Sequence, residues 1–162
     1  MPDHSAANAR ALPCELIPSE PMRVLIVANQ TATSPALIAE LKERTRRGAV
    51  RLHLVVPALN SRLRHWLSDS DQAVRLAQQR GEEARSLMAA HAVWVSVEIG
   101  DSVPIHAIAD ALAAFHADEI LISTLPADRS HWLERGLIDR SRHRFGVPVV
   151  HIIAAEPATL AA

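Results

Sequence analysis

The chain has 162 residues, of which 49% are apolar, and its formal net charge is −1 at pH 7. A chain of this length and composition can bury the core of one domain, which excludes wholesale disorder. The near-zero charge excludes the strongly basic face of a nucleic-acid-binding protein. Aromatic residues make up only 3%, which also argues against a base-stacking surface.

The cellular compartment follows from what the sequence lacks. Cys14 is the only cysteine, so there is no intramolecular disulfide and no cysteine-based metal cluster. No stretch reaches the roughly eighteen apolar residues of a membrane span. Residues 1–20 contain no apolar run of signal-peptide length, and we interpret them as a flexible tail. We therefore expect a cytoplasmic protein with one folded domain at 21–155 and a second tail at 156–162.

The first predicted elements alternate between strand and helix. The apolar runs 22–28 and 50–56 predict two strands that are buried on both faces. Between them we expect a helix that begins after Ser34 and ends at Gly48. Serine is a favoured N-cap, Pro35 suits the first helical turn, and glycine favours a helix C-terminus.

A longer connection, 57–70, leads into a long helix at about 71–91 and a third strand at 93–99. Loops of this length are uncommon in compact domains and often functional. We expect five apolar side chains of the long helix to face inward: Val74, Ala77, Ala84, Leu87 and Met88. Three side chains of the third strand share one face, which is typical of a sheet edge: Trp94, Ser96 and Glu98.

The C-terminal half continues the alternation with a third helix after 100–104, a strand at 119–123, a fourth helix at about 131–144 and a last strand at 147–154. Ser102 and Ser130 are the expected N-caps of the two helices, and Gly146 closes the second. The third helix has an apolar core stripe at helical spacing: Ile105, Ile108, Leu112 and Phe115.

Five strands alternating with four main helices predict a single doubly wound α/β domain with a mainly parallel five-stranded sheet. We expect the strand order 3-2-1-4-5, because it places the most apolar strands, the first and fourth, inside the sheet. In this order the chain winds outward in opposite directions from these two strands. Ligands bind in the crevice at their carboxyl ends.

Polar turns follow both of these strands. Their hydroxyl groups, one arginine and the first N–H groups of the following helices favour a phosphate group. The second strand ends nearby, and a glycine lies in the last helix. The predicted nucleotide or phosphate site therefore consists of nine residues: Asn29, Thr31, Thr33, Val56, Ser123, Thr124, Arg129, Ser130 and Gly136. Helix capping alone is the alternative explanation for Ser34, Ser102 and Ser130.

No pattern in the sequence indicates catalysis or a metal site. The nine histidines have no metal-ligand spacing, and no G-x-S-x-G nucleophile elbow is present. The alternative class is a nucleotide-hydrolysing or nucleotidyl-transferring enzyme that uses Thr124, Arg129 and Ser130, with Asp128 as the one acidic group of the turn. Phosphorelay receivers and flavin carriers are weaker alternatives, because the first strand ends in Asn29 without an acidic cluster, a glycine or an aromatic residue.

The chain combines this order of elements with a long connection after the second strand and with the ending Phe145-Gly146-Val-Pro148-Val-Val-His-Ile-Ile153. In these features it resembles the universal stress protein family over about residues 22–154. The runs Val24-Leu-Ile-Val-Ala-Asn29-Gln-Thr31 and Ile122-Ser-Thr-Leu-Pro126-Ala-Asp-Arg129-Ser130-His-Trp132-Leu-Glu134-Arg135 are similar to a divergent actinobacterial branch.

ATP-binding members of that family carry the motif G-x2-G-x9-G followed by serine or threonine. The corresponding residues here are Ser123, Pro126, Gly136 and Leu137, so only Gly136 matches. Asn29 stands where members have an acidic residue. The resemblance implies ATP or another adenine nucleotide as ligand, with Mg²⁺ accompanying it. We expect Arg129 and Ser130 to replace phosphate contacts that the glycine backbone would supply.

The resemblance also implies a function. We expect a non-enzymatic regulatory or adaptor protein that acts on an unidentified protein partner. Family members often pair through the last strand, and the run Val147 to Ile153 would otherwise be an exposed apolar edge. A homodimer through this strand is therefore expected, with no nucleic-acid or membrane partner.

Overall fold

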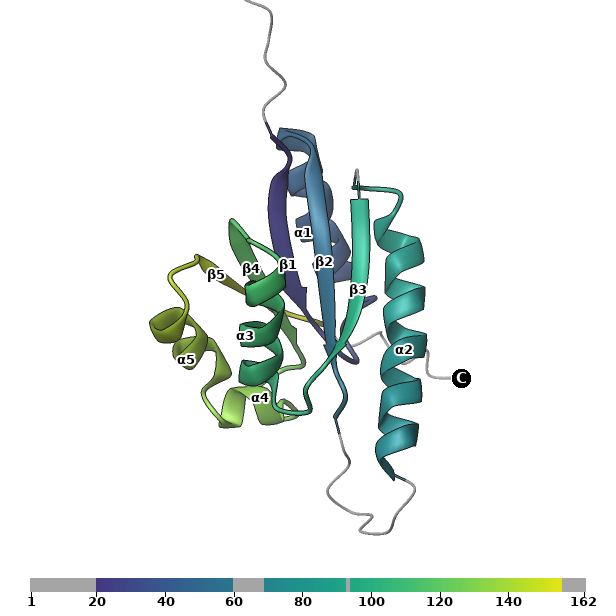
Figure 1. The fold of residues 1–162 in the computed structure, drawn as a ribbon, viewed down its shortest axis with the longest axis vertical. Helices are drawn as coiled ribbons and strands as arrows, with labels where there is room; N and C mark the ends of the chain where they lie inside the picture. Colours follow the sequence, from purple (N-terminus) through teal and green to yellow (C-terminus); the bar gives the residue numbers. More distant parts are fainter. Residues whose placement is uncertain (1–19, 60–68, 93, 156–162) are drawn as a thin grey trace, which may run out of the picture.

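A computed structural model describes residues 20–59, 69–92 and 94–155, in which strands and helices alternate (Figure 1). The strands are β1 (Met22–Val27), β2 (Val50–Pro57), β3 (Trp94–Gly100), β4 (Glu119–Thr124) and β5 (Val149–Ile153). The helices are α1 (Pro35–Arg47), α2 (Asp69–Met88), α3 (Pro104–Ala114), α4 (His131–Glu134) and α5 (Leu137–Arg144). Most of the predicted 57–70 connection lies at 60–68, outside the described residues.

The five strands form one parallel sheet in the order β3-β2-β1-β4-β5, which confirms the predicted topology. β1 lies inside the sheet, where Ile26 is opposite Leu54 of β2 and Leu121 of β4. Because all strands run in the same direction, their carboxyl ends lie at the same end of the sheet. This is the lower end in Figure 1.

Alternate side chains of β1 enter two separate cores. Val24 and Ile26 pack with residues of α1 and α2, whereas Leu25 and Val27 pack with residues of α3, α4 and α5. Figure 1 shows the two groups of helices on opposite sides of the sheet. All four side chains are fully buried, and burying each contributes about 1.5–3 kcal/mol. This explains why β1 is a continuous apolar run.

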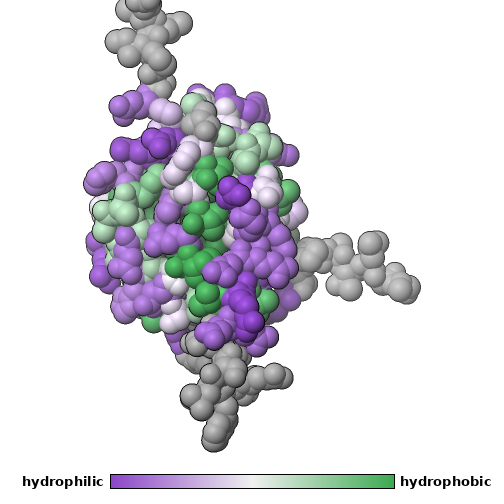
Figure 2. All heavy atoms as spheres, turned by 45° about the vertical axis from the view of Figure 1, so that its right-hand side comes forward, coloured by the Kyte–Doolittle hydropathy of each residue, from purple (hydrophilic) through white to green (hydrophobic). Residues whose placement is uncertain are grey.

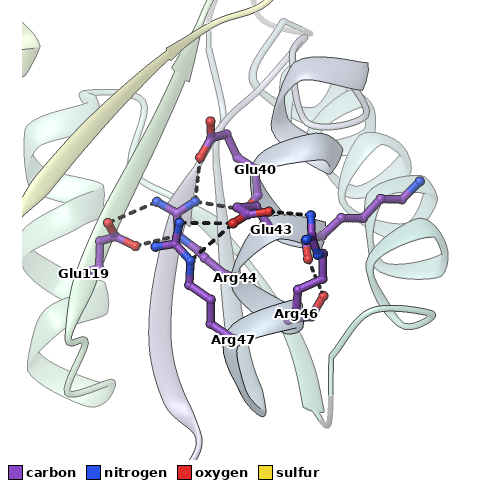
Figure 3. A network of polar contacts seen from close by, with 8 residues as sticks. Glu40, Glu43, Arg44, Arg46, Arg47 and Glu119 are labelled. Atoms are coloured by element: carbon purple, nitrogen blue, oxygen red, sulfur yellow. Dashed lines mark hydrogen bonds and ion pairs between the residues drawn. The ribbon is translucent and has the colours of Figure 1, made fainter.

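Helix α1 begins and ends where the sequence predicts. The Ser34 hydroxyl accepts a hydrogen bond from the backbone N–H of Leu37 at 3.3 Å, Pro35 occupies the first turn, and Gly48 is the C-cap. An ion pair then fixes α1 to the start of β4. Arg44 donates from Nε to Glu119 Oε2 at 2.6 Å and from Nη2 to Oε1 at 3.0 Å (Figure 3).

Helix α2 faces the sheet with a narrow stripe of mostly small residues. Ala77, Gly81, Ala84 and Met88 are buried. The predictions for Val74 and Leu87 were wrong, because these side chains are 37% and 48% exposed. Close contact of the small residues with the sheet leaves the flanking positions of the helix in solvent.

Helix α3 has a different N-cap from the predicted one. Its N-cap residue is Val103, whose backbone N–H donates to Asp101 Oδ1 at 2.7 Å, so the prediction for Ser102 was wrong. The Asp101 carboxylate thus binds the backbone N–H of the N-cap residue itself. The predicted core stripe holds: Ile105 and Ile108 are buried, and Leu112 and Phe115 pack against the same core.

The predicted single helix at 131–144 is two helices, α4 and α5, separated at Arg135 and Gly136. Gly136 has a φ of 62°, in the left-handed region, which ends one helix and begins the other. Ser130 occupies the N-cap position of α4, but its side chain makes no capping hydrogen bond. Trp132 of α4 is buried in the core on this side of the sheet.

β3 and β5 form the two edges of the sheet, and the edge position predicted for β3 is confirmed. On the side that carries α2 and β3, apolar side chains form a band between polar ones (Figure 2). Exposed apolar residues of these two elements include Leu76, Leu87 and Trp94. None of the described helices is long and apolar enough to cross a membrane.

Candidate functional site

The turn after β1 and the end of β4 are in direct contact. The Thr31 hydroxyl donates to the backbone oxygen of Ser123 at 2.9 Å, and both residues are buried. Two backbone bonds fold the turn itself, from Ala32 to Asn29 at 3.2 Å and from Ser34 to Thr31 at 3.0 Å. We call residues 28–34 together with 123–130 the β1/β4 junction. The structure thus brings together the two segments that the sequence assigns to one site.

Asn29 connects the junction to two further elements. Its side chain is buried, with Nδ2 donating to the backbone oxygen of Pro57, the last residue of β2, at 2.5 Å. Asn29 Oδ1 accepts a hydrogen bond from Nη1 of Arg80, a half-buried residue of α2. A guanidinium group is therefore held where the carboxyl ends of β1 and β2 meet.

Sequence reasoning missed Arg80, and its position depends on the neighbouring Gly81. A Cβ atom at Gly81 would lie 2.6 Å from Val97 Cγ1 and 3.5 Å from Val56 Cγ2, so α2 approaches the sheet closely. This approach brings Arg80 within reach of Asn29. The only signal in the sequence is a glycine within a helical pattern, which indicates a packing constraint.

Val56 was predicted as a site residue, and its side chain is fully buried in the core on the α1 and α2 side. It lies beneath Gly81 of α2. Any contact of Val56 with a ligand would therefore come from its backbone.

The two hydroxyl residues at the end of β4 have different surroundings. Ser123 is 1% exposed, and its Oγ has no hydrogen-bond partner among the described residues. An unsatisfied buried hydroxyl costs about 1–3 kcal/mol, so Ser123 is the junction residue with the clearest unused donor. Thr124, by contrast, is hydrogen-bonded through Oγ1 to His151 Nε2 of β5 at 2.8 Å. Burial and the positive charge of Arg142 lower the pKa of His151.

The remaining predicted site residues lie on the β4–α4 turn and beside it. Ser130 is buried, whereas Arg129 and Thr33 are exposed. The backbone N–H of Arg129 donates to the Pro126 carbonyl at 2.9 Å and closes the turn. Gly136 lies beyond α4, where its left-handed conformation starts α5.

Two of the four motif positions have an evident structural role. Gly136 needs the left-handed conformation that glycine adopts without strain. Leu137 is 3% exposed and packs in the core beneath α4 and α5. A hydroxyl side chain at this position would lose those apolar contacts.

The junction offers hydroxyl groups, an amide and the guanidinium group of Arg129, and Arg80 of α2 adds a second guanidinium group beside Asn29. Asp128 is the one acidic residue of the β4–α4 turn and is exposed. Among the residues that the structure describes, no group of three or more histidine, cysteine, aspartate or glutamate residues is arranged to hold a metal ion.

No protein-family model matches this sequence, and no curated protein matches it. Solved structures do match. A universal stress protein from Archaeoglobus fulgidus superposes with a TM-score of 0.55 at 17% identity, over 81% of this chain and 93% of that one. The universal stress protein from Archaeoglobus fulgidus in complex with dAMP gives a TM-score of 0.54 at 16% identity, over 81% of this chain and 97% of that one.

A universal stress protein family protein from Arabidopsis thaliana with AMP bound superposes with a TM-score of 0.52 at 10% identity, over 83% of this chain and 93% of that one. At such identities the superpositions report on the fold alone. The chain therefore has the fold of universal stress proteins.

Proposed function

We propose that this chain is a divergent universal stress protein that binds an adenine nucleotide at the β1/β4 junction and acts as a non-enzymatic cytoplasmic regulator or adaptor. The observation that carries the proposal is the contact of Thr31 with Ser123, which joins the two turns at the carboxyl ends of the central strands. Ligands of open parallel sheets bind at this place. Structures of the same fold have dAMP and AMP bound, which supports an adenine nucleotide as the ligand.

Phosphate binding in this proposal depends on side chains. Pro126 occupies a motif position and has no backbone N–H to donate. Arg129 and Ser130 follow it in the turn, and the unsatisfied Ser123 hydroxyl lies at the end of β4. A guanidinium and two hydroxyl groups would replace the donors of a glycine-rich loop, and Mg²⁺ would accompany a di- or triphosphate.

The proposal of a non-enzymatic role rests on the acidic groups. Hydrolysis or transfer of a phosphoryl group needs a positioned base or metal-binding carboxylates. Asp128 is the only acidic side chain in the β4–α4 turn, and it is exposed. A nucleotide held here would serve as a bound signal, and a conformational or surface change would pass it to a protein partner.

We also propose a homodimer through β5. This strand is an edge of the sheet, and Ile153 at its end is 54% exposed. An exposed apolar edge strand favours pairing with another strand. A second copy of the same edge gives a closed two-fold interface.

Calorimetric titration with Mg·ATP tests the binding proposal. We expect micromolar affinity for the native protein and loss of binding in the Arg129→Ala/Ser130→Ala variant. Arg140→Ala is the matched control, because it removes an exposed arginine from the neighbouring helix α5. Unchanged affinity in the double variant would place the phosphates elsewhere. No heat at millimolar ATP with a folded protein would contradict nucleotide binding.

A further inference from the structure

Arg80 differs from six other described arginines in the group that its guanidinium contacts. These six pair with carboxylates: Arg23, Arg44, Arg46, Arg47, Arg85 and Arg142. Arg80 is half-buried, and its guanidinium contacts the neutral amide oxygen of Asn29. No described carboxylate forms an ion pair with it. A partly buried cation without an anion is unfavourable, which indicates a place for an anionic partner.

The hydrogen bond to Pro57 fixes the orientation of the Asn29 side chain, independently of Arg80. Its amide nitrogen is bound to the Pro57 carbonyl, so its oxygen can point only toward α2. A guanidinium carries five N–H donors in a rigid fork, and the bond to Asn29 uses one of them. The remaining donors keep a set orientation at the carboxyl ends of β1 and β2. Such a preorganised fork suits the oxygens of a phosphate group.

The amide of Asn29 also preserves the charge of Arg80. An aspartate at this position would form an ion pair with the guanidinium and neutralise it. An amide accepts the same hydrogen bond and leaves the positive charge available to a ligand. Helix α1 begins a few residues later, at Pro35, and its N-terminal end adds a partial positive charge in the same region.

We propose that Arg80 binds a phosphate group of the ligand and that Asn29 is its positioning residue, so that the junction selects phosphorylated nucleosides over free ones. The inference rests on the proposed function, since it names the ligand class of the same site. It adds α2 to the site, whereas the sequence-predicted residues lie in β2, in β4, in the turns after β1 and β4, and at Gly136 between α4 and α5.

The test compares AMP with adenosine, by titration of the full chain and of three variants. Arg80→Gln removes the charge but keeps an N–H donor for Asn29 Oδ1, so it preserves the local hydrogen bond. Asn29→Asp keeps the size of the side chain and adds a competing carboxylate. Arg75→Gln is the matched control, because Arg75 is an exposed arginine of α2 whose Nε donates to the Asp71 carbonyl. Thermal unfolding verifies that each variant is folded.

We expect Arg80→Gln to weaken AMP binding by about tenfold or more and to change adenosine binding by less than about twofold, since a charged hydrogen bond to phosphate is lost. Asn29→Asp should weaken AMP binding in the same direction, and Arg75→Gln should change neither affinity. Added salt should weaken AMP binding to the native protein more than to Arg80→Gln.

Two failures are distinguishable. Equal AMP affinity in native protein and Arg80→Gln would overturn the role of Arg80 and leave the proposed nucleotide site standing. Absence of AMP binding by the native protein at millimolar concentration would overturn both proposals.

Discussion

Among the ion pairs of the described residues, the pair of Arg44 with Glu119 is the least exposed, and its geometry is bidentate. The two side chains are only 11% and 13% exposed, and hydrogen bonding to Glu119 raises the pKa of Arg44. Without Glu119, the enclosed guanidinium of Arg44 keeps only the half-exposed carboxylate of Glu40 as an ion-pair partner, at 2.7 Å. We expect Glu119→Ala to lower the free energy of unfolding by about 2–4 kcal/mol in urea denaturation.

Glu43→Ala is the control for this experiment. Glu43 pairs with Arg46 and Arg47, whose side chains are 79% and 76% exposed (Figure 3). Exposed pairs contribute about 0–1 kcal/mol, so this variant should be nearly as stable as the native protein. Equal losses in the two variants would show that enclosure of the Arg44 pair has no energetic consequence.

His151 makes the stability of the fold depend on pH. Burial, and secondarily Arg142, lower its pKa from the ordinary value of 6.5. The unfolded chain therefore takes up a proton at higher pH than the folded chain, so stability is complete above about 6.5 and is lost as the pH falls through the folded pKa. We expect the free energy of unfolding to decrease as the pH falls below about 6.5.

The variant His151→Gln should lose part of this pH dependence, as measured by urea denaturation at a series of pH values. His116→Gln, at an exposed position after α3, serves as the control. An identical pH profile in the native protein and in His151→Gln would contradict the assignment to His151.

At the scale of elements, the approach of α2 to the sheet depends on Gly81. Alanine normally favours a helix over glycine by about 1 kcal/mol. Here its Cβ would lie 2.6 Å from Val97 Cγ1, so the helix or the strand must move. We expect Gly81→Ala to destabilise the protein by about 1–3 kcal/mol in urea denaturation, against the helix propensity.

Gly48→Ala provides the comparison, because a Cβ at Gly48 has no neighbour within 4 Å. Its effect on the free energy of unfolding should be small. If Gly81→Ala stabilised the protein, the close packing of α2 on β2 and β3 would be wrong, and with it the placement of Arg80.

Elements with strong local signals could be predicted from the sequence. The apolar runs identified β1 and β2, and Ser34, Pro35 and Gly48 fixed the ends of α1. The prediction failed where neighbouring groups compete. Asp101 rather than Ser102 accepts a hydrogen bond at the start of α3. Gly136 divides into two helices a segment that was predicted as one.

The candidate site could be predicted only in part, because the strand ends follow a general rule and the position of Arg80 does not. Asn29, Thr31 and Ser123 follow from the rule that the carboxyl ends of parallel strands lie at one end of the sheet. The structure joins Thr31 to Ser123 and Asn29 to the end of β2. Arg80 does not follow from any such rule. It is a half-buried residue beside the stripe of small residues on α2, and its contact with Asn29 exists because α2 packs closely at Gly81.

At the scale of the whole molecule, the proposed dimer forms through the β5 edge of the sheet and not through the β3 edge. Ile153 lies on the β5 edge and is 54% exposed, while Trp94 lies on the β3 edge and is 42% exposed. We expect sedimentation to show a dimer for the native protein, a monomer for Ile153→Arg and a dimer for Trp94→Arg. A native monomer, or dissociation by Trp94→Arg alone, would contradict pairing through β5.

The central claim is that the β1/β4 junction binds an adenine nucleotide. The most direct measurement is a titration of the isotope-labelled protein with AMP, followed through its backbone amide signals by NMR. We predict saturable shifts confined to the turn after β1, the start of α1, the β4–α4 turn and Arg80 of α2. Unchanged spectra at millimolar AMP, or shifts only at the β3 and β5 edges, would contradict the claim.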